Sequence, residues 1–172
     1  GAQLRQLIEA PEITVLPGVH DTLSALIAQN CGAKAISAGG YAATASLLGR
    51  PDSSQLSLTE LGAYYARMTA RLEIPILADG DTGFGNVTHV TRTVRVMERS
   101  GVGGFLLDDQ VFPKRCGHMA GKAIIGVEEM VSKLKAALDA RQGDTMIMAR
   151  TDAIATDGFQ EALYRMALFQ EI

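Results

Sequence analysis

The stretch Pro75-Ile76-Leu77-Ala78-Asp79-Gly80-Asp81 joins a short apolar run to two acidic residues, and it decides how the chain folds. Its first four residues are apolar without alternation, which is typical of a strand buried on both faces of a parallel sheet. The acidic pair follows at the strand end, and functional side chains gather at the carboxyl ends of parallel strands. The stretch therefore predicts a parallel strand over residues 75–81 with a functional site at its end.

The same pattern repeats on both sides of this stretch. Further apolar runs predict strands over residues 13–19, 33–38, 103–109 and 145–152. Amphipathic patterns predict helices over residues 22–30, 57–72, 87–100, 127–141 and 159–172, with Ser57 or Thr59 as the cap of the second. Alternating strands and helices leave two architectures, an open doubly wound sheet or a (β/α)₈ barrel.

Polar residues at the predicted strand ends favour the barrel. They follow three successive strands: Asp79 and Asp81, Asp108 and Asp109, and Arg150 and Asp152. Contributions from several successive strands fit a barrel rim better than a single crevice. Five βα units cannot close an eight-stranded barrel, and the sequence ends within a predicted helix. We therefore expect one α/β domain over residues 1–172, a (β/α)₈ TIM-type barrel of which this chain covers about the first five units.

Composition restricts the partners. The 172 residues carry a formal net charge of −3, whereas nucleic acids and anionic membranes require a basic surface. No apolar run approaches the length of a membrane span. The N-terminal Gly1-Ala2-Gln3-Leu4 lacks a signal-peptide pattern, and the two cysteines do not suggest a disulfide framework. A cytoplasmic enzyme with a small-molecule substrate is therefore expected, without a nucleic-acid or membrane partner.

The acidic pair has two interpretations. Asp79 and Asp81 can aim at one point if the strand ends between them, and such hard oxygen ligands suit Mg²⁺. Alternatively, the pair belongs to a solvated turn in which aspartate is a turn former. The following Gly83-Phe84-Gly85 is not a dinucleotide-binding fingerprint, because the glycine pattern is incomplete.

A second candidate site is Lys114-Arg115-Cys116-Gly117-His118-Met119. Cations around a thiol favour the thiolate, so Cys116 is a candidate reactive cysteine in a loop at the rim. The alternative is a basic surface loop with an incidental cysteine, and a zinc site lacks sufficient ligands. Arg150 ends the last predicted strand, where it would suit either a substrate carboxylate or an ion pair with Asp152 or Asp108.

Residues 114–119 resemble the signature of isocitrate lyases and their relatives. Other segments match the same superfamily in order: Gly49-Arg50-Pro51-Asp52, Asp79-Gly80-Asp81, Asp109-Gln110-Val111 and Met148-Ala149-Arg150-Thr151-Asp152. From about Val15 to its end, the chain is therefore similar to the isocitrate lyase/phosphoenolpyruvate mutase superfamily, and most of all to its 2-methylisocitrate and 2-alkylmalate lyases.

The resemblance implies a Mg²⁺-dependent barrel that acts on a small di- or tricarboxylate, assembled as a homodimer or homotetramer. By this resemblance the metal residues are Asp79 and Asp81, supported by Asp52 and Asp108. The catalytic residues are Cys116 as the acid/base, Arg150, and Lys114 and His118 of a gating loop. The substrate-binding residues are Gly39, Gly40, Tyr41, Gly117 and Arg150.

Two departures concern the site: Asp108 stands where the superfamily often has glutamate, and Gly39 stands at its serine position. The activity expected is Mg²⁺-dependent cleavage of a carbon–carbon bond in a 2-substituted malate or 2-methylisocitrate-like acid, with release of pyruvate or another 2-oxo acid. Three alternatives remain: oxaloacetate hydrolysis or decarboxylation, phosphonate mutation or hydrolysis, and a degenerate barrel without catalysis.

Overall fold

The centre of the fold is a parallel sheet, seen in a computed structural model that describes residues 1–117 and 119–172. Its strands are β1 (Ile36–Ala38), β2 (Ile76–Asp79), β3 (Gly104–Asp108) and β4 (Met146–Arg150). Their spatial order, β1-β2-β3-β4, is also their order in the sequence. A doubly wound sheet reverses its order at a switch point, whereas a (β/α) barrel progresses in one direction, as this sheet does.

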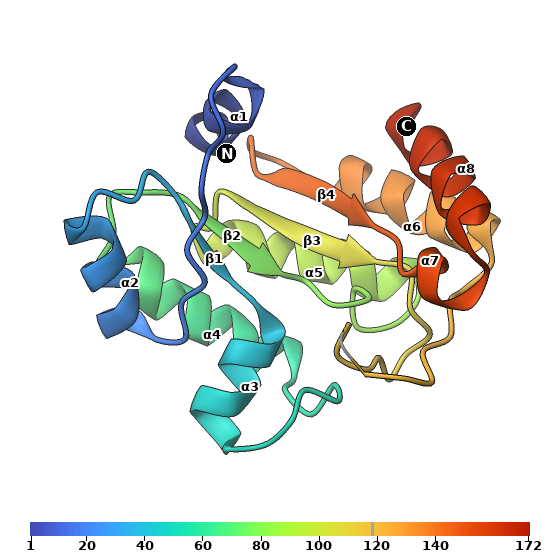
Figure 1. Cartoon of the computed structure of the whole chain (residues 1–172), viewed down its shortest axis with the longest axis horizontal. Helices are drawn as coiled ribbons and strands as arrows, with labels where there is room; N and C mark the ends of the chain where they lie inside the picture. Colours follow the sequence, from blue (N-terminus) through green and yellow to red (C-terminus); the bar gives the residue numbers. More distant parts are fainter. Residues whose placement is uncertain (118) are drawn as a thin grey trace.

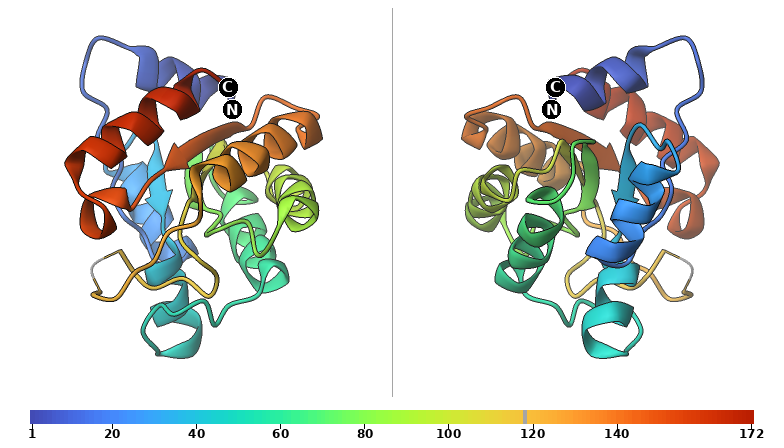
Figure 2. Two further views of the ribbon diagram at one scale, coloured as in Figure 1. Left: turned by 90° about the vertical axis from the view of Figure 1, so that its right-hand side faces the viewer. Right: turned by 90° about the vertical axis from the view of Figure 1, so that its left-hand side faces the viewer.

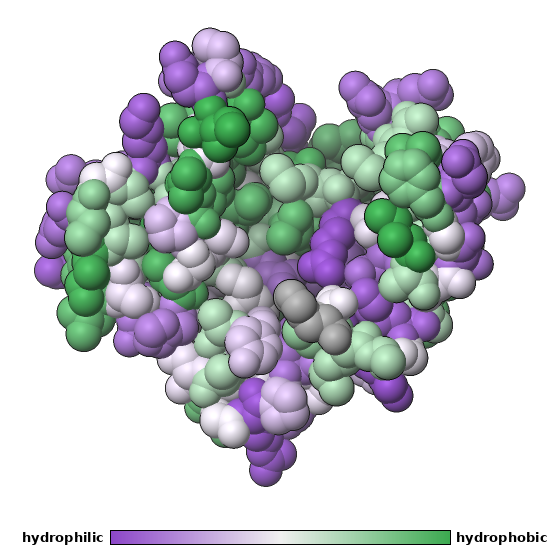
Figure 3. Space-filling view, viewed as in Figure 1, coloured by the Kyte–Doolittle hydropathy of each residue, from purple (hydrophilic) through white to green (hydrophobic). Residues whose placement is uncertain are grey.

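Helices follow the strands at the predicted places. They are α2 (Thr22–Asn30), α4 (Leu58–Thr69), α5 (Val87–Arg99), α6 (Val127–Ala140) and α8 (Phe159–Gln170). Helices α4, α5 and α6 lie behind the sheet in Figure 1, and the side views in Figure 2 show that they cover one face of it. The opposite face is hollowed at its centre (Figure 3).

Local signals explain where two of these helices begin. Ser57 caps α4 in a reciprocal capping box with Glu60, so Ser57 rather than Thr59 is the cap. Asp21 and Ser24 form the same arrangement at the start of α2. Each helix then buries apolar residues against the strands in one continuous core that includes Tyr65, Val90 and Phe105.

The predicted strand over residues 13–19 is wrong. Ile13 and Val15 are largely exposed, and the segment pairs with the sheet only at an isolated parallel bridge between Gly18 and Ser37. At this bridge the Pro17 carbonyl accepts from the Ser37 N–H, and the Val19 N–H donates to the Ser37 carbonyl. Pro17 itself has no N–H to donate. The segment thus lies beside β1, where the first strand of a barrel belongs, without forming a strand.

Three helices were not predicted: α1 (Ala2–Glu9), α3 (Gly40–Leu48) and α7 (Ala153–Thr156). Leu4 of α1 is fully buried, and the N-terminal amine lies 3.2 Å from Asp144, just before β4. Helix α3 begins directly after β1 and lies with the long loops near the carboxyl ends of the strands (Figure 1). None of the helices in the described parts of the chain has the length and apolarity needed to cross a membrane.

Candidate active site

Four buried carboxylates meet where β2 and β3 end. Asp79 is the last residue of β2 and Asp108 the last of β3, Asp81 follows Asp79 in a tight turn, and Asp52 comes from the segment after α3. All four are at most 7% exposed. The turn places Asp81 at a positive φ of 50°, which few non-glycine residues adopt, and the Asp81 N–H donates to Asp79 Oδ1 at 3.0 Å.

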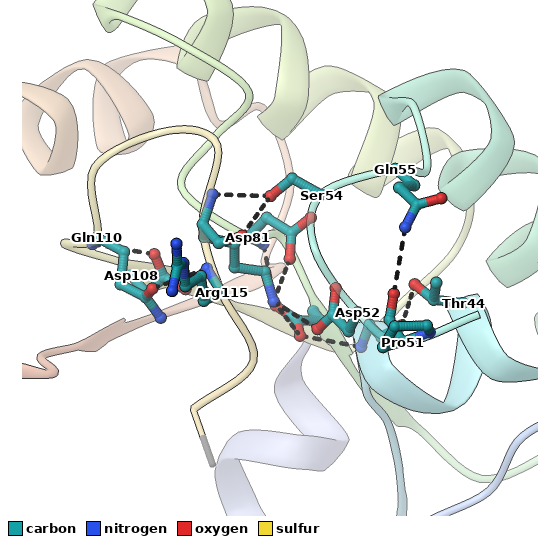
Figure 4. A network of polar contacts seen from close by, with 12 residues as sticks. Thr44, Pro51, Asp52, Ser54, Gln55, Asp81, Asp108, Gln110 and Arg115 are labelled. Atoms are coloured by element: carbon teal, nitrogen blue, oxygen red, sulfur yellow. Dashed lines mark hydrogen bonds and ion pairs between the residues drawn. The ribbon is translucent and has the colours of Figure 1, made fainter. Parts of the chain in front are cut away.

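The ammonium group of Lys114 lies inside this cluster. Its Nζ is 2.7 Å from Asp81 Oδ1, 2.9 Å from Asp52 Oδ2 and 3.7 Å from Asp79 Oδ2. Figure 4 shows the resulting network, which links Asp52, Asp81 and the segment around Ser54. Burial alone would lower the pKa of Lys114, but the charges of Asp79 and Asp81 more than offset this and raise it above its usual value. Lys114 is therefore a fixed cation among these carboxylates.

Asp79 is held by its surroundings on both oxygens. While Oδ1 accepts from Asp81, Oδ2 accepts from the N–H of Gly40 at 2.9 Å, in the first turn of α3. A Cβ at Gly40 would lie 3.0 Å from this oxygen, so glycine allows the close approach. The hydroxyl of buried Tyr65 accepts from the Asp79 N–H at 3.1 Å and lies 3.2 Å from the carbonyl oxygen of Ala38. Tyr65 thus fixes the ends of β1 and β2 together.

Two of the carboxyl groups hold protons more tightly than an exposed aspartate. Burial, and then the negative charge of Asp79, raise the pKa of Asp81 to about 7. The same two causes raise the pKa of Asp108 to about 6. Concentrated negative charge of this kind favours a cation in the cluster.

The donor set fits Mg²⁺. Among the described residues, no group of three or more His, Cys, Asp and Glu side chains is arranged to hold a metal ion. Magnesium does not require such a group, because it usually binds through one or two carboxylates and keeps several waters. Asp81 Oδ1 is buried and lies 2.7 Å from Lys114 Nζ, so this point already accommodates a positive charge.

The loop between β3 and α6 carries the cysteine to the cluster. The N–H of Cys116 donates to the Asp52 carbonyl at 3.2 Å, and the N–H of Lys114 donates to Ser54 Oγ at 2.9 Å. Cys116 is half-buried. His118, the other candidate of this loop, lies outside the described residues.

Arg150 reaches the same region from the end of β4. Asp108 and Arg150 are register partners, so the ends of β3 and β4 lie side by side. The Arg150 side chain is 34% exposed, and its Nη2 lies 3.2 Å from Asp152 Oδ2. Of the two interpretations of Arg150, the ion pair with Asp152 is therefore present, and the exposed part of the guanidinium remains accessible to a carboxylate.

The predicted substrate-binding residues Gly39 and Tyr41 lie at the start of α3. Gly39 is the N-cap of this helix, whereas Tyr41 is 61% exposed. Sequence reasoning missed Tyr65, although a tyrosine on the buried face of a helix requires a hydrogen-bond partner. It also missed Gln110 and Lys122, whose polar side chains gave no signal of the contacts that they make.

Gly117 supports a prediction that separates substrate binding from folding. A Cβ at Gly117 would lie 2.4 Å from Arg150 Nη2, so Gly117→Ala must displace the mobile end of Arg150. We expect the KM for the di- or tricarboxylate substrate that the resemblance implies to rise about tenfold, the loss of roughly one charge-assisted hydrogen bond, while the melting temperature stays unchanged. Steady-state kinetics would measure this effect. Gly126→Ala, where a Cβ meets nothing within 4 Å, is the matched control, and an equal KM in both variants would contradict the prediction.

The site combines a carboxylate cluster at the strand ends, a loop that carries a cysteine, and an arginine at the rim. These groups lie on a parallel sheet whose strands follow one another in sequence order, as in the (β/α)-barrel class of enzymes. The family model "Phosphoenolpyruvate phosphomutase" matches residues 4–171. The chain therefore belongs to the phosphoenolpyruvate phosphomutase family, within the isocitrate lyase/phosphoenolpyruvate mutase superfamily.

Several lyases are similar in sequence. The chain is 46% identical to 2,3-dimethylmalate lyase from Eubacterium barkeri, over 99% of this chain and 59% of the relative. It is 44% identical to 2-methylisocitrate lyase from Aeropyrum pernix, over 99% of this chain and 55% of the relative. The chain thus spans less than two thirds of the length of these relatives.

Solved structures of the superfamily share the fold. An oxaloacetate acetylhydrolase in complex with the inhibitor 3,3-difluorooxalacetate superimposes with a TM-score of 0.95 at 36% identity, covering 99% of this chain and 59% of that one. A phosphonopyruvate hydrolase in complex with oxalate and Mg²⁺ gives 0.89 at 30% identity, with coverages of 99% and 59%. The predicted TIM-type α/β fold is therefore confirmed.

Proposed function

We propose that the protein is a Mg²⁺-dependent carbon–carbon lyase, which cleaves a 2-substituted malate or a 2-methylisocitrate-like acid to a 2-oxo acid and a carboxylic acid. The observation that carries this proposal is the direct contact between the cysteine loop and the carboxylate cluster, through the Cys116 N–H and the Asp52 carbonyl. Cys116 as the acid/base group, the carboxylate cluster as the cation site, and Arg150 would then surround the same region. The similarity to 2,3-dimethylmalate lyase and 2-methylisocitrate lyase supports this choice of substrate class.

Asp79 and Asp81 would hold the metal, with Asp52 and Asp108 in support. Bound magnesium would supply a Lewis acid for the 2-hydroxyl and carboxylate oxygens of the substrate. The turn at Asp81 and the hydrogen bond from Gly40 to Asp79 keep these ligands in place before substrate arrives. Lys114 would balance the remaining negative charge of the site.

Cys116 would act at the carbon that departs. Loss of the hydroxyl proton to solvent and cleavage of C2–C3 produce the 2-oxo acid and leave an electron pair on C3. Cys116 would donate its proton to this carbon, and Arg150 would hold a substrate carboxylate during the step. Lys114 and His118 belong to the same loop and would act with Cys116. Gly39, Gly40, Tyr41 and Gly117 are the other residues that we assign to the substrate side.

A second candidate function is hydrolysis or decarboxylation of oxaloacetate. It is favoured by the likeness to oxaloacetate acetylhydrolase, and the same carboxylate cluster would serve it. The two are distinguished by Cys116→Ser: we expect oxaloacetate turnover to survive this change, whereas cleavage of the 2-hydroxy acid would need Cys116 as its proton donor. The cysteine loop also favours the lyase over phosphonate chemistry.

The proposal is tested with the full-length protein, with Mg²⁺ or with EDTA, by assaying 2-oxo acid release from 2,3-dimethylmalate, 2-methylisocitrate and isocitrate. For oxaloacetate, the assay follows its loss and the formation of oxalate or pyruvate. We expect Mg²⁺-dependent turnover of a substituted malate or isocitrate. Turnover of oxaloacetate alone would support the second candidate. Silence on every substrate would contradict both and favour phosphonates or a degenerate barrel. A homodimeric or homotetrameric assembly stays a prediction, which sedimentation would check.

A further inference from the structure

Asp152, which no step of the proposed reaction uses, receives contacts from both ends of the cysteine loop. Its carboxylate accepts from Gln110 Nε2 at 2.9 Å, from Lys122 Nζ at 2.9 Å and from Arg150 Nη2 at 3.2 Å. Gln110 stands before Cys116 and Lys122 stands after it. Burial works to raise the pKa of Asp152, but the hydrogen bond from Lys122 and the charge of Arg150 outweigh it and lower the pKa. The carboxylate is thus a stable anion for these three donors.

Asp152 is itself held rigidly. Its N–H donates to Asp109 Oδ1 at 3.0 Å, and the neighbouring Thr151 hydroxyl donates to Asp109 Oδ2 at 2.7 Å. Asp109 is fully buried and forms an ion pair with Arg165 of α8 at 3.0 Å. A loop attached to Asp152 is therefore attached to the ends of β3 and β4 and to α8.

Lys122 and Gln110 each extend this attachment to the backbone of the cysteine loop. Lys122 Nζ donates to the Gly117 carbonyl at 2.8 Å as well as to Asp152. Gln110 Oε1 accepts from the Arg115 N–H at 3.1 Å while its Nε2 donates to Asp152. Arg115 and Gly117, which flank Cys116 in the sequence, are thus each linked to Asp152 through the side chain of one residue.

We propose that Lys122 and Gln110 are positioning residues, which hold the backbone on either side of Cys116 against Asp152 and so set the cysteine beside Arg150. This inference rests on the proposed role of Cys116 in the lyase reaction. The side of the loop that contacts Asp52 and Ser54 is fixed by backbone groups, by Ser54 and by the ion pairs of Lys114, whereas Lys122 and Gln110 hold the side near Arg150. Because Gly117 lies against Arg150, a shift of this side of the loop would move Cys116 away from the arginine that binds the substrate carboxylate.

The test compares Lys122→Met, Gln110→Leu, Lys122→Arg and Lys135→Met in the full-length protein. Lys135 is exposed on α6, so Lys135→Met removes one lysine charge away from the loop. One readout is the rate at which iodoacetamide alkylates Cys116, followed by mass spectrometry of its peptide. The other is the separation of kcat from KM on the substrate that the wild type cleaves. Melting temperatures report whether each variant is folded.

We expect Lys122→Met to change the rate of Cys116 alkylation by roughly tenfold and to lower kcat by a similar factor, the loss of about one charge-assisted hydrogen bond. Gln110→Leu should act in the same direction, and Lys122→Arg should recover most of the effect, because arginine keeps the charge and donors. Wild-type alkylation and kcat in folded Lys122→Met and Gln110→Leu would overturn the proposal. If Lys122→Met does not fold, Gln110→Leu and Lys122→Arg decide the question. If the wild type cleaves no substrate, the proposed function fails, while alkylation still tests the positioning.

Discussion

Replacing Cys116 by serine is expected to lower kcat for the 2-hydroxy acid by about 10²–10⁴-fold, the usual contribution of a positioned general acid. A serine hydroxyl is a much weaker acid than a thiol, so it cannot supply a proton to the departing carbon at neutral pH. The backbone contact of residue 116 with Asp52 does not involve the side chain, so the loop should keep its place. Steady-state kinetics with the best substrate of the panel would measure the loss.

Cys31→Ser is the matched control for this variant. Cys31 is exposed at the end of α2 and is not part of the site at the carboxyl ends of the strands, so its replacement should leave kcat unchanged. Isothermal titration of Cys116→Ser with Mg²⁺ should give the wild-type affinity, since the metal ligands are untouched. A Cys116→Ser enzyme with undiminished kcat would show that another group protonates the product.

Asp79→Asn is expected to weaken Mg²⁺ binding by more than about 100-fold, because even residues that only support metal ligands typically contribute 10–100-fold. Both Asp79 oxygens accept backbone hydrogen bonds, from Asp81 and from Gly40. An asparagine has one oxygen for these two donors and turns its amide toward the other, in addition to losing the charge. Titration calorimetry with Mg²⁺ would measure the affinity, and turnover should fall with it.

Asp139→Asn removes one charge from an exposed position on α6 and serves as the control, with unchanged affinity expected. Equal Mg²⁺ affinity in Asp79→Asn and Asp139→Asn would contradict the assignment of the metal site. That result would mean that Lys114, without a metal ion, balances the negative charge of the carboxylate cluster.

The carboxylate site was predictable because strand ends are visible in the sequence. The apolar run before Asp79 ends where β2 ends, and the run before Asp108 ends where β3 ends. Parallel strands bring such ends to one edge, so Asp79 and Asp108 had to lie close together. The side chains that gather at the carboxyl ends of the strands can therefore be predicted from the sequence alone.

Other features could not be predicted, because they depend on tertiary contacts. Pro17 and the exposed Ile13 and Val15 look like part of a strand, but the backbone of this segment bonds to the sheet at the Gly18 bridge rather than along a ladder. Helix α3 was not predicted, because its start is not a local signal: Gly39 is the N-cap without a side-chain hydrogen bond, and the Gly40 N–H donates to Asp79 of β2. The place of Lys114 inside the carboxylate cluster follows from a contact 62 residues distant in the chain, which no local pattern encodes.

Nuclear magnetic resonance of the products formed in D₂O with Mg²⁺ separates the lyase reaction from its alternatives. We expect equal amounts of a 2-oxo acid and a carboxylic acid, with one deuterium at the carbon that was C3 of the substrate. Cys116→Ser should form these products far more slowly. Cleavage that is independent of Cys116 and Mg²⁺, or products that retain the C2–C3 bond, would contradict the proposed lyase reaction.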